Sequence, residues 1–227
     1  MKSNRSIITL GILLGSGLIA HATVIGFGNL GGSNTTVPAN LGSNATANGN
    51  GFVVTNGTTP NIAVSWDANW DIHTSNFFAG LENLTIGGGA WDNEGSVPRI
   101  GQLDFGTHTI TLSADPGFAL VLNSFNFGQT AETAGTTQWT LSLKAVSTSL
   151  EVWNQSVTLN NSPAANALVT ITPNFTGALG EDYTLTFNRT SETYGSNGRH
   201  GIDNFSFNQI FPSLRWQASP GWAPPLC

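Results

Sequence analysis

Apolar and polar residues alternate along most of the chain with a period of two. His108, Ile110 and Leu112 share one side of their stretch, and threonine or serine occupies the positions between them. The stretches 138–144 and 183–188 follow the same pattern. Such alternation is typical of a strand with one side on the core and one side toward solvent. We therefore predict antiparallel strands whose outer side is rich in threonine.

Further strands are predicted where a short apolar run is bounded by Gly, Asn, Ser or Pro. One of these runs changes phase, and a bulge near residues 123–124 would return Phe125 to the side of Leu122. About eleven short strands, with no helical window after the first 22 residues, predict an all-β fold. The predicted architecture is a two-sheet antiparallel β-sandwich, jelly-roll-like. The additional stretches are 23–28, 51–55, 61–66, 100–105, 117–127, 150–159, 166–173 and 202–208.

The N-terminus has the layout of a secretory signal peptide. Lys2 and Arg5 precede an apolar run, which ends in the small-residue pattern Ala20-His21-Ala22. The run is shorter than the roughly 20 apolar residues that a membrane-spanning helix needs, and no later stretch reaches that length. We therefore predict a signal peptide (1–22), no membrane span in the mature chain, and a secreted location that is either extracellular or at the cell surface.

The mature chain divides into a domain and a tail. The β-sandwich domain is predicted over 23–209, and the proline-rich residues 210–227 form an irregular tail. Residues 29–50 consist almost entirely of Gly, Asn, Ser, Thr and Ala, which predicts a flexible loop. Residues 67–99 are predicted to form a second, more aromatic loop.

Charge and cysteine content restrict the partners and the compartment. Without Lys2 and Arg5 the chain keeps five basic residues against thirteen acidic ones, a formal net charge of −8. Nucleic acid and anionic lipid are disfavoured because both require clustered Lys and Arg. Cys227 is the only cysteine, so no internal disulfide can form. Nothing in the sequence indicates an oligomeric state.

The sequence contains no recognisable catalytic motif. The mature histidines, His73, His108 and His200, are widely separated, and His108 lies on the apolar side of its strand, as a core histidine would. No nucleophile elbow, zinc-binding helix, phosphate loop or dinucleotide fingerprint occurs. We predict that the chain is not an enzyme. A polysaccharide-active enzyme is the weaker alternative, because a catalytic carboxylate pair need not be close in sequence.

One carboxylate is a candidate metal ligand. With simple alternation, Asp203 shares the inner side of its strand with Phe205 and Phe207. A carboxylate facing the core is costly unless it is paired or coordinated. Asp203 with Asn204 supplies the oxygen ligands that calcium prefers, so a structural calcium is the only cofactor considered. The alternative is that Asp203 lies at the strand edge and bonds loop amides or pairs with Arg199.

Three tryptophans are candidates for stacking against sugar rings. Trp66, Trp70 and Trp91 flank the central loop, where exposed rings would form a lectin-like platform. Core packing is an equally good interpretation, above all for Trp66 at the end of an apolar strand.

Five short motifs stand out along the chain: Trp-Asp at 70–71, Gly-Gln-Leu-Asp-Phe at 101–105, Asn-Ser-Phe-Asn-Phe at 123–127, Val-Trp-Asn at 152–154 and Gly-Ile-Asp-Asn-Phe-Ser-Phe at 201–207. Together they resemble the PEP-CTERM sorting-domain proteins, exported proteins abundant in Verrucomicrobia and related bacteria. The resemblance covers about residues 60 to 209. Its Ile-Asp-Asn motif is also similar to the last strand of jelly-roll carbohydrate-binding modules, in which an aspartate often helps to bind a structural calcium.

The resemblance implies an exported, non-enzymatic cell-surface or extracellular-matrix protein associated with exopolysaccharide or biofilm. A carbohydrate-binding module that recognises extracellular polysaccharide is the alternative. Members of the family end in a Pro-Glu-Pro motif, an apolar helix and an arginine cluster, and residues 210–227 contain no recognisable anchor of this kind. The abrupt change of composition suggests the hypothesis that these residues are read out of frame.

Overall fold

The computed structural model describes residues 22–27, 30, 34–46, 53–55, 58–74, 99–103, 106–129, 135–161, 167–193 and 200–211. Their regular secondary structure is β-strand, which confirms the all-β class, and each predicted stretch contains a strand. The strands are β1 (Thr23–Ile25), β2 (Thr35–Thr36), β3 (Val53–Thr55), β4 (Ile62–Trp66), β5 (Trp70–Thr74), β6 (Arg99–Leu103), β7 (Thr107–Ala114), β8 (Ala119–Gln129), β9 (Gly135–Ala145), β10 (Glu151–Asn161), β11 (Ala167–Ile171), β12 (Phe175–Thr176), β13 (Tyr183–Glu192) and β14 (His200–Ile210).

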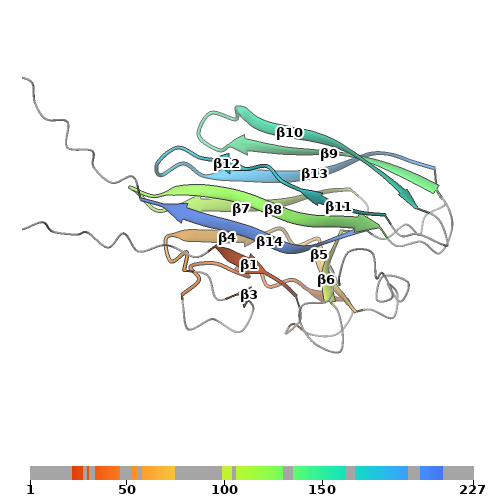
Figure 1. Cartoon of the computed structure of the whole chain (residues 1–227), viewed down its shortest axis with the longest axis horizontal. Coiled ribbons are helices and arrows are strands. Elements are labelled where there is room, and N and C mark those ends of the chain that lie inside the picture. Colours follow the sequence, from red (N-terminus) through yellow and green to blue (C-terminus); the bar gives the residue numbers. More distant parts are fainter. Residues whose placement is uncertain are drawn as a thin grey trace, which may run out of the picture.

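The strands form two antiparallel sheets that make up a sandwich (Figure 1). The nine-stranded sheet has the order β11-β8-β14-β6-β5-β2; in addition, β1 pairs with β14, β3 pairs with β1, and β12 pairs with β8. The five-stranded sheet has the order β10-β9-β13-β7-β4. From β7 to β14 the chain crosses repeatedly between the sheets, so the sandwich is jelly-roll-like, as predicted.

The core lies between the inner sides of the two sheets. Phe127 of β8 meets Trp139 of β9 with ring centroids 5.3 Å apart, and Phe125 packs against Phe187 of β13 at 5.5 Å. All four rings are buried. Burying each large apolar side chain stabilises the fold by about 1.5–3 kcal/mol, so these contacts hold the two sheets together.

The predicted bulge in β8 is present. Ser206 pairs with Ser124, whereas the next residue, Phe207, pairs with Leu122, which leaves Asn123 as the extra residue of β8. Leu122 and Phe125 are both buried on the inner side as a result. The bulge therefore corrects the phase change that the sequence contains.

A second bulge, in β14, corrects the expected orientation of Asp203. Asp203 pairs with Asn126 and Ser206 pairs with Ser124. Between these two pairs β14 advances by three residues and β8 by two. Asn204 lies in this bulge with a φ of 51°. Ile202 and Phe205 consequently both belong to the core, and Asp203 lies on the outer side of the nine-stranded sheet, not on the side of Phe205 as simple alternation predicted.

Parts of the two predicted loops pack on the core instead. Within 29–50 the described residues include β2, and Val37 and Leu41 are buried. The Val37 N–H donates to the Trp70 carbonyl at 2.9 Å, which ties this segment to β5. β5 itself lies inside the expected loop 67–99. The described part of 29–50 therefore contacts the core through its few apolar residues, and its flexibility stays a prediction.

Two motif glycines allow the β6–β14 region to pack closely. A Cβ atom added to Gly101 would lie 2.7 Å from the ring of Phe27, and one added to Gly201 would lie 2.2 Å from Ile100. A side chain at Gly101 would have to displace the buried ring of Phe27, whereas at Gly201 the atom in the way is the end of the flexible Ile100 side chain. The recurring glycines at the start of the motifs at 101–105 and 201–207 therefore have a packing role.

The predicted signal peptide lies outside the described residues except for Ala22, and the tail lies outside them beyond Phe211. Ile210, the expected first residue of the tail, is the last residue of β14. In the described part of the chain, no helix has the length and apolarity needed to cross a membrane.

Candidate functional site

Trp66 and Trp70 are core residues and offer no free ring face to a sugar. Their exposed fractions are 3% and 0%, and their rings meet edge to face at 5.1 Å. Both indole N–H groups are bonded inside the protein, Trp66 Nε1 to the Leu41 carbonyl at 2.9 Å and Trp70 Nε1 to the Thr109 carbonyl at 3.0 Å. The stacking prediction is therefore wrong for these two residues, because the β4–β5 turn places them between the sheets. Trp91 lies outside the described residues.

Asp203 is buried on the outer side of the nine-stranded sheet, with an exposed fraction of 1%. Its Oδ1 accepts a hydrogen bond from the Asn204 backbone N–H at 2.7 Å, and its Oδ2 accepts one from Asn204 Nδ2 at 3.4 Å. The left-handed backbone of Asn204 makes this local arrangement possible. Bonding of Asp203 to a local amide is one of the two alternatives left open by the sequence, and Arg199 lies outside the described residues.

The residues around Asp203 supply only part of a calcium site. Calcium takes about six to eight oxygen ligands. Among the described residues, no group of three or more His, Cys, Asp or Glu side chains could hold a metal ion. Asp203 and Asn204 could contribute a carboxylate and an amide oxygen, and the calcium site stays a prediction.

Millimolar Ca²⁺ is expected to raise the melting temperature of the EDTA-treated domain by several degrees if Asp203 is a ligand, because an ion that binds only the folded state stabilises it. Differential scanning calorimetry with Ca²⁺ and with Mg²⁺ measures the shift. The Asp203→Asn variant should lose it. An unchanged melting temperature in Ca²⁺ would eliminate the site.

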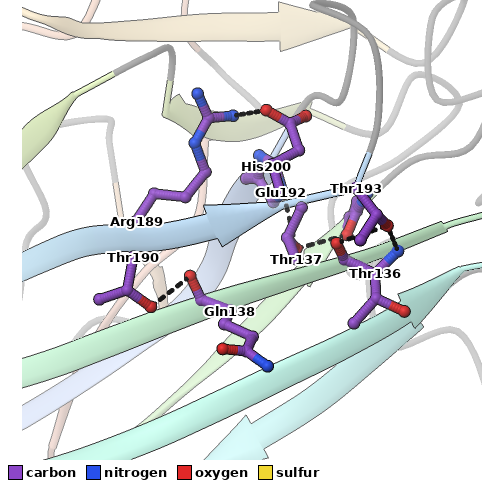
Figure 2. A network of polar contacts seen from close by, with 9 residues as sticks. Thr136, Thr137, Gln138, Arg189, Thr190, Glu192, Thr193 and His200 are labelled. Carbon is purple, nitrogen blue, oxygen red and sulfur yellow. Dashed lines mark hydrogen bonds and ion pairs between the residues drawn. The ribbon is translucent and has the colours of Figure 1, made fainter.

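The two histidines with described side chains are core residues. His108 is buried against the ring of Trp70, with centroids 5.5 Å apart, as its position on the apolar side predicted. His200 is buried at the start of β14, and its Nε2 lies 3.1 Å from Thr137 Oγ1 (Figure 2). Burial, reinforced by the positive charge of Arg189, lowers the pKa of His200 from 6.5 to about 3. His200 is therefore neutral at physiological pH.

The outer side of the five-stranded sheet is a regular polar surface of the described domain. Neighbouring strands are paired so that its side chains form rows: Thr111 pairs with Thr184, Thr109 with Thr186, and Thr186 with Ser142. The adjacent row continues from Thr140 to Ser156. We call this surface the hydroxyl face and define it by Thr109, Thr111, Thr140, Ser142, Ser156, Thr158, Thr184 and Thr186, of which Ser142 is buried.

The side chains that define the hydroxyl face are uncharged, but charged side chains border them: Asp67 lies at Thr109, and Lys144 lies beside Thr184. Thr111 Oγ1 and Thr184 Oγ1 are 3.2 Å apart, and Thr109 Oγ1 donates to Asp67 Oδ2 at 3.0 Å, so part of the face is already ordered by side-chain bonds. Lys144 pairs with Glu151 at one margin. Each hydroxyl can donate one hydrogen bond and accept others. The face can therefore bind a neutral ligand that itself presents hydroxyl groups.

The sequence shows which residues belong to this surface but not how the strands are arranged. The threonine-rich outer side of each strand is visible in the alternation of 107–113, 138–144 and 183–188. The strand order β10-β9-β13-β7, which brings these separate stretches into one sheet, is visible only in the structure.

Comparison with known proteins identifies no family. No protein-family model matches the chain, and no curated protein matches it. Among solved structures, an arabinose-bound α-L-arabinofuranosidase (MgGH51) is 10% identical with a TM-score of 0.41, over 84% of this chain and 27% of that one. A carbohydrate-binding module in complex with β-1,4-galactotriose (TmCBM61) is 11% identical with a TM-score of 0.31, over 66% and 88% of the two chains. A module specific for non-crystalline cellulose (CBM28) is 13% identical with a TM-score of 0.31, over 51% and 77%.

Proposed function

We propose that this chain is an exported, non-catalytic domain that binds extracellular polysaccharide through the hydroxyl face. The observation that carries the proposal is the row arrangement of neutral hydroxyl side chains across β10, β9, β13 and β7. Strands in a sheet are about 4.8 Å apart, so this face extends about 14 Å across the strands. A surface of that width suits several consecutive sugar residues of a polymer.

The charge of the chain favours a neutral polymer. The mature chain has a formal net charge of −8, so its field repels anionic polysaccharides. The hydroxyls of a neutral polysaccharide both donate and accept hydrogen bonds, as do those of threonine and serine. The resemblance to PEP-CTERM proteins supports exopolysaccharide of a cell-surface or matrix layer as the natural ligand.

Replacing three hydroxyls of the face by isosteric methyl groups is expected to weaken polysaccharide binding at least tenfold. Thr140, Thr158 and Thr186 come from β9, β10 and β13, and valine keeps both their shape and their preference for strands. Each lost hydrogen bond costs about 0.5–1.5 kcal/mol. Sedimentation with insoluble cellulose, xylan and β-1,3-glucan measures the bound fraction of the wild type and of the triple variant.

Thr176→Val is the matched control, because Thr176 is an exposed threonine of the nine-stranded sheet. Its bound fraction should equal that of the wild type. If a correctly folded triple variant binds as well as the control, the polysaccharide-binding site does not lie on the hydroxyl face. Failure of the wild type to bind any neutral polysaccharide would overturn the function, and release of reducing ends from the polymer would contradict the absence of catalysis.

A further inference from the structure

One end of the core is polar instead of apolar. There, Gln129 and His200 pair across β8 and β14, and Thr137 pairs with Glu192 across β9 and β13. Trp139 lies against His200, with ring centroids 4.8 Å apart. Gln129, Thr137 and His200 have exposed fractions of 0%, so these groups lie inside the protein. We call Gln129, Thr137, Trp139, Glu192 and His200 the polar end.

A chain of hydrogen bonds determines which atoms of the polar end can donate. Thr137 Oγ1 donates its only hydrogen to Gln129 Oε1 at 2.7 Å. It must therefore accept the bond from His200 Nε2, the 3.1 Å contact drawn in Figure 2. The proton of the neutral ring is consequently on Nε2. His200 Nδ1 is then a hydrogen-bond acceptor.

Four buried polar atoms of the polar end have no hydrogen-bond partner. Two are donors, Gln129 Nε2 and Trp139 Nε1, and two are acceptors, His200 Nδ1 and Glu192 Oε1. The other carboxylate oxygen of Glu192 pairs with Arg189 at 2.9 Å. A buried polar atom without a partner destabilises a fold, and here both kinds occur together.

The combination of donors and acceptors selects the chemistry of a ligand. A cation would be repelled by the N–H groups of Gln129 and Trp139, and an anion has no hydrogen to give to His200 Nδ1 or Glu192 Oε1. A neutral molecule that donates two hydrogen bonds and accepts two has the groups that complement these four atoms. Because these atoms are closed off from the surface, that molecule must also be very small.

We propose that the polar end is a binding site for an internal water molecule, which accepts from Trp139 Nε1 and Gln129 Nε2 and donates to His200 Nδ1 and Glu192 Oε1. Buried waters typically make about three hydrogen bonds to groups that would otherwise be unsatisfied. This water would join the ends of β8, β9, β13 and β14 where the apolar core stops. Its role is structural and independent of the proposed polysaccharide binding.

Water–protein NOE spectroscopy on the ¹⁵N-labelled wild-type domain tests the site directly. The indole Hε1 of Trp139 should show a cross-peak to a long-lived water. The indole Hε1 of Trp70 is the internal control, because it is bonded directly to the Thr109 carbonyl and should show none. Absence of the cross-peak at Trp139 would overturn the proposal.

Gln129→Met supplies a second test. The change removes Nε2 together with Oε1, the acceptor of the Thr137 hydroxyl, so stability should fall whether or not a water is bound. The discriminating result is therefore the Trp139 cross-peak: a bound water that has lost its Gln129 donor should give a weaker cross-peak, and an unchanged cross-peak would contradict the contact with Gln129. Should this variant fail to fold, the wild-type cross-peak still decides the outcome.

Discussion

Replacing Trp70 by alanine is expected to lower the free energy of unfolding by about 3–5 kcal/mol, the usual cost of deleting a large buried aromatic side chain. Trp70 is fully buried, and its ring meets those of Trp66, His108 and Phe187 at 5.1, 5.5 and 5.4 Å. The change also leaves the Thr109 carbonyl without its indole partner. Guanidinium denaturation followed by far-UV circular dichroism measures the loss.

Trp70→Phe is the graded control for this prediction. It keeps an aromatic ring in the core but removes the indole N–H, so its loss should be clearly smaller than that of the alanine variant. A different result would follow if Trp70 were a sugar-stacking residue. In that case the alanine variant would retain its stability and lose polysaccharide binding, and that outcome would contradict the core position of Trp70.

Acidification is expected to destabilise the domain well above the pH at which carboxylates titrate. The folded state keeps His200 neutral, with a pKa of about 3, whereas the unfolded state takes up a proton near 6.5. The stabilising effect of the neutral ring is therefore complete above pH 6.5 and is lost as the pH falls toward 3. The expected slope is about 1.4 kcal/mol per pH unit in this window. Urea denaturation at a series of pH values measures it.

Between pH 5 and 6.5, the effect of His200 on stability can be distinguished from that of the carboxylates. Hydrogen bonds from Ser147 lower the pKa of Glu181 below 4.5, so its stabilising effect is lost only at lower pH. His200→Gln, which retains a hydrogen-bonding group for Thr137, should flatten the profile between pH 5 and 6.5. A flat profile in the wild type would show that His200 is not held neutral by burial.

The strand pattern was predictable because it depends on local alternation. Ile110 and Leu112 are inward in the structure for the reason visible in the sequence, namely that a strand turns every second residue to the same side. The bulge near 123–124 was predictable for the same reason, since a phase change within one apolar run requires an extra residue. The second bulge, at Asn204, is not marked by a phase change within an apolar run. The sequence therefore placed Asp203 on the wrong side of its strand.

The placement of the aromatic residues depended on the tertiary structure. A tryptophan in a turn region fits a core and an exposed platform equally well, because its large apolar surface suits both. For Trp66 and Trp70 the decision came from the β4–β5 turn, which passes from one sheet to the other and leaves both rings between them.

By itself, the sequence determined the all-β class, the position of most strands and the threonine-rich outer sides, because each follows from the period-two pattern of neighbouring residues. Only the tertiary structure decided which strands lie side by side. That order combines separate threonine stretches into the hydroxyl face, and it brings His200 to Thr137, 63 residues away in the chain. Contacts of this range depend on how the two sheets pack, and no local pattern encodes them.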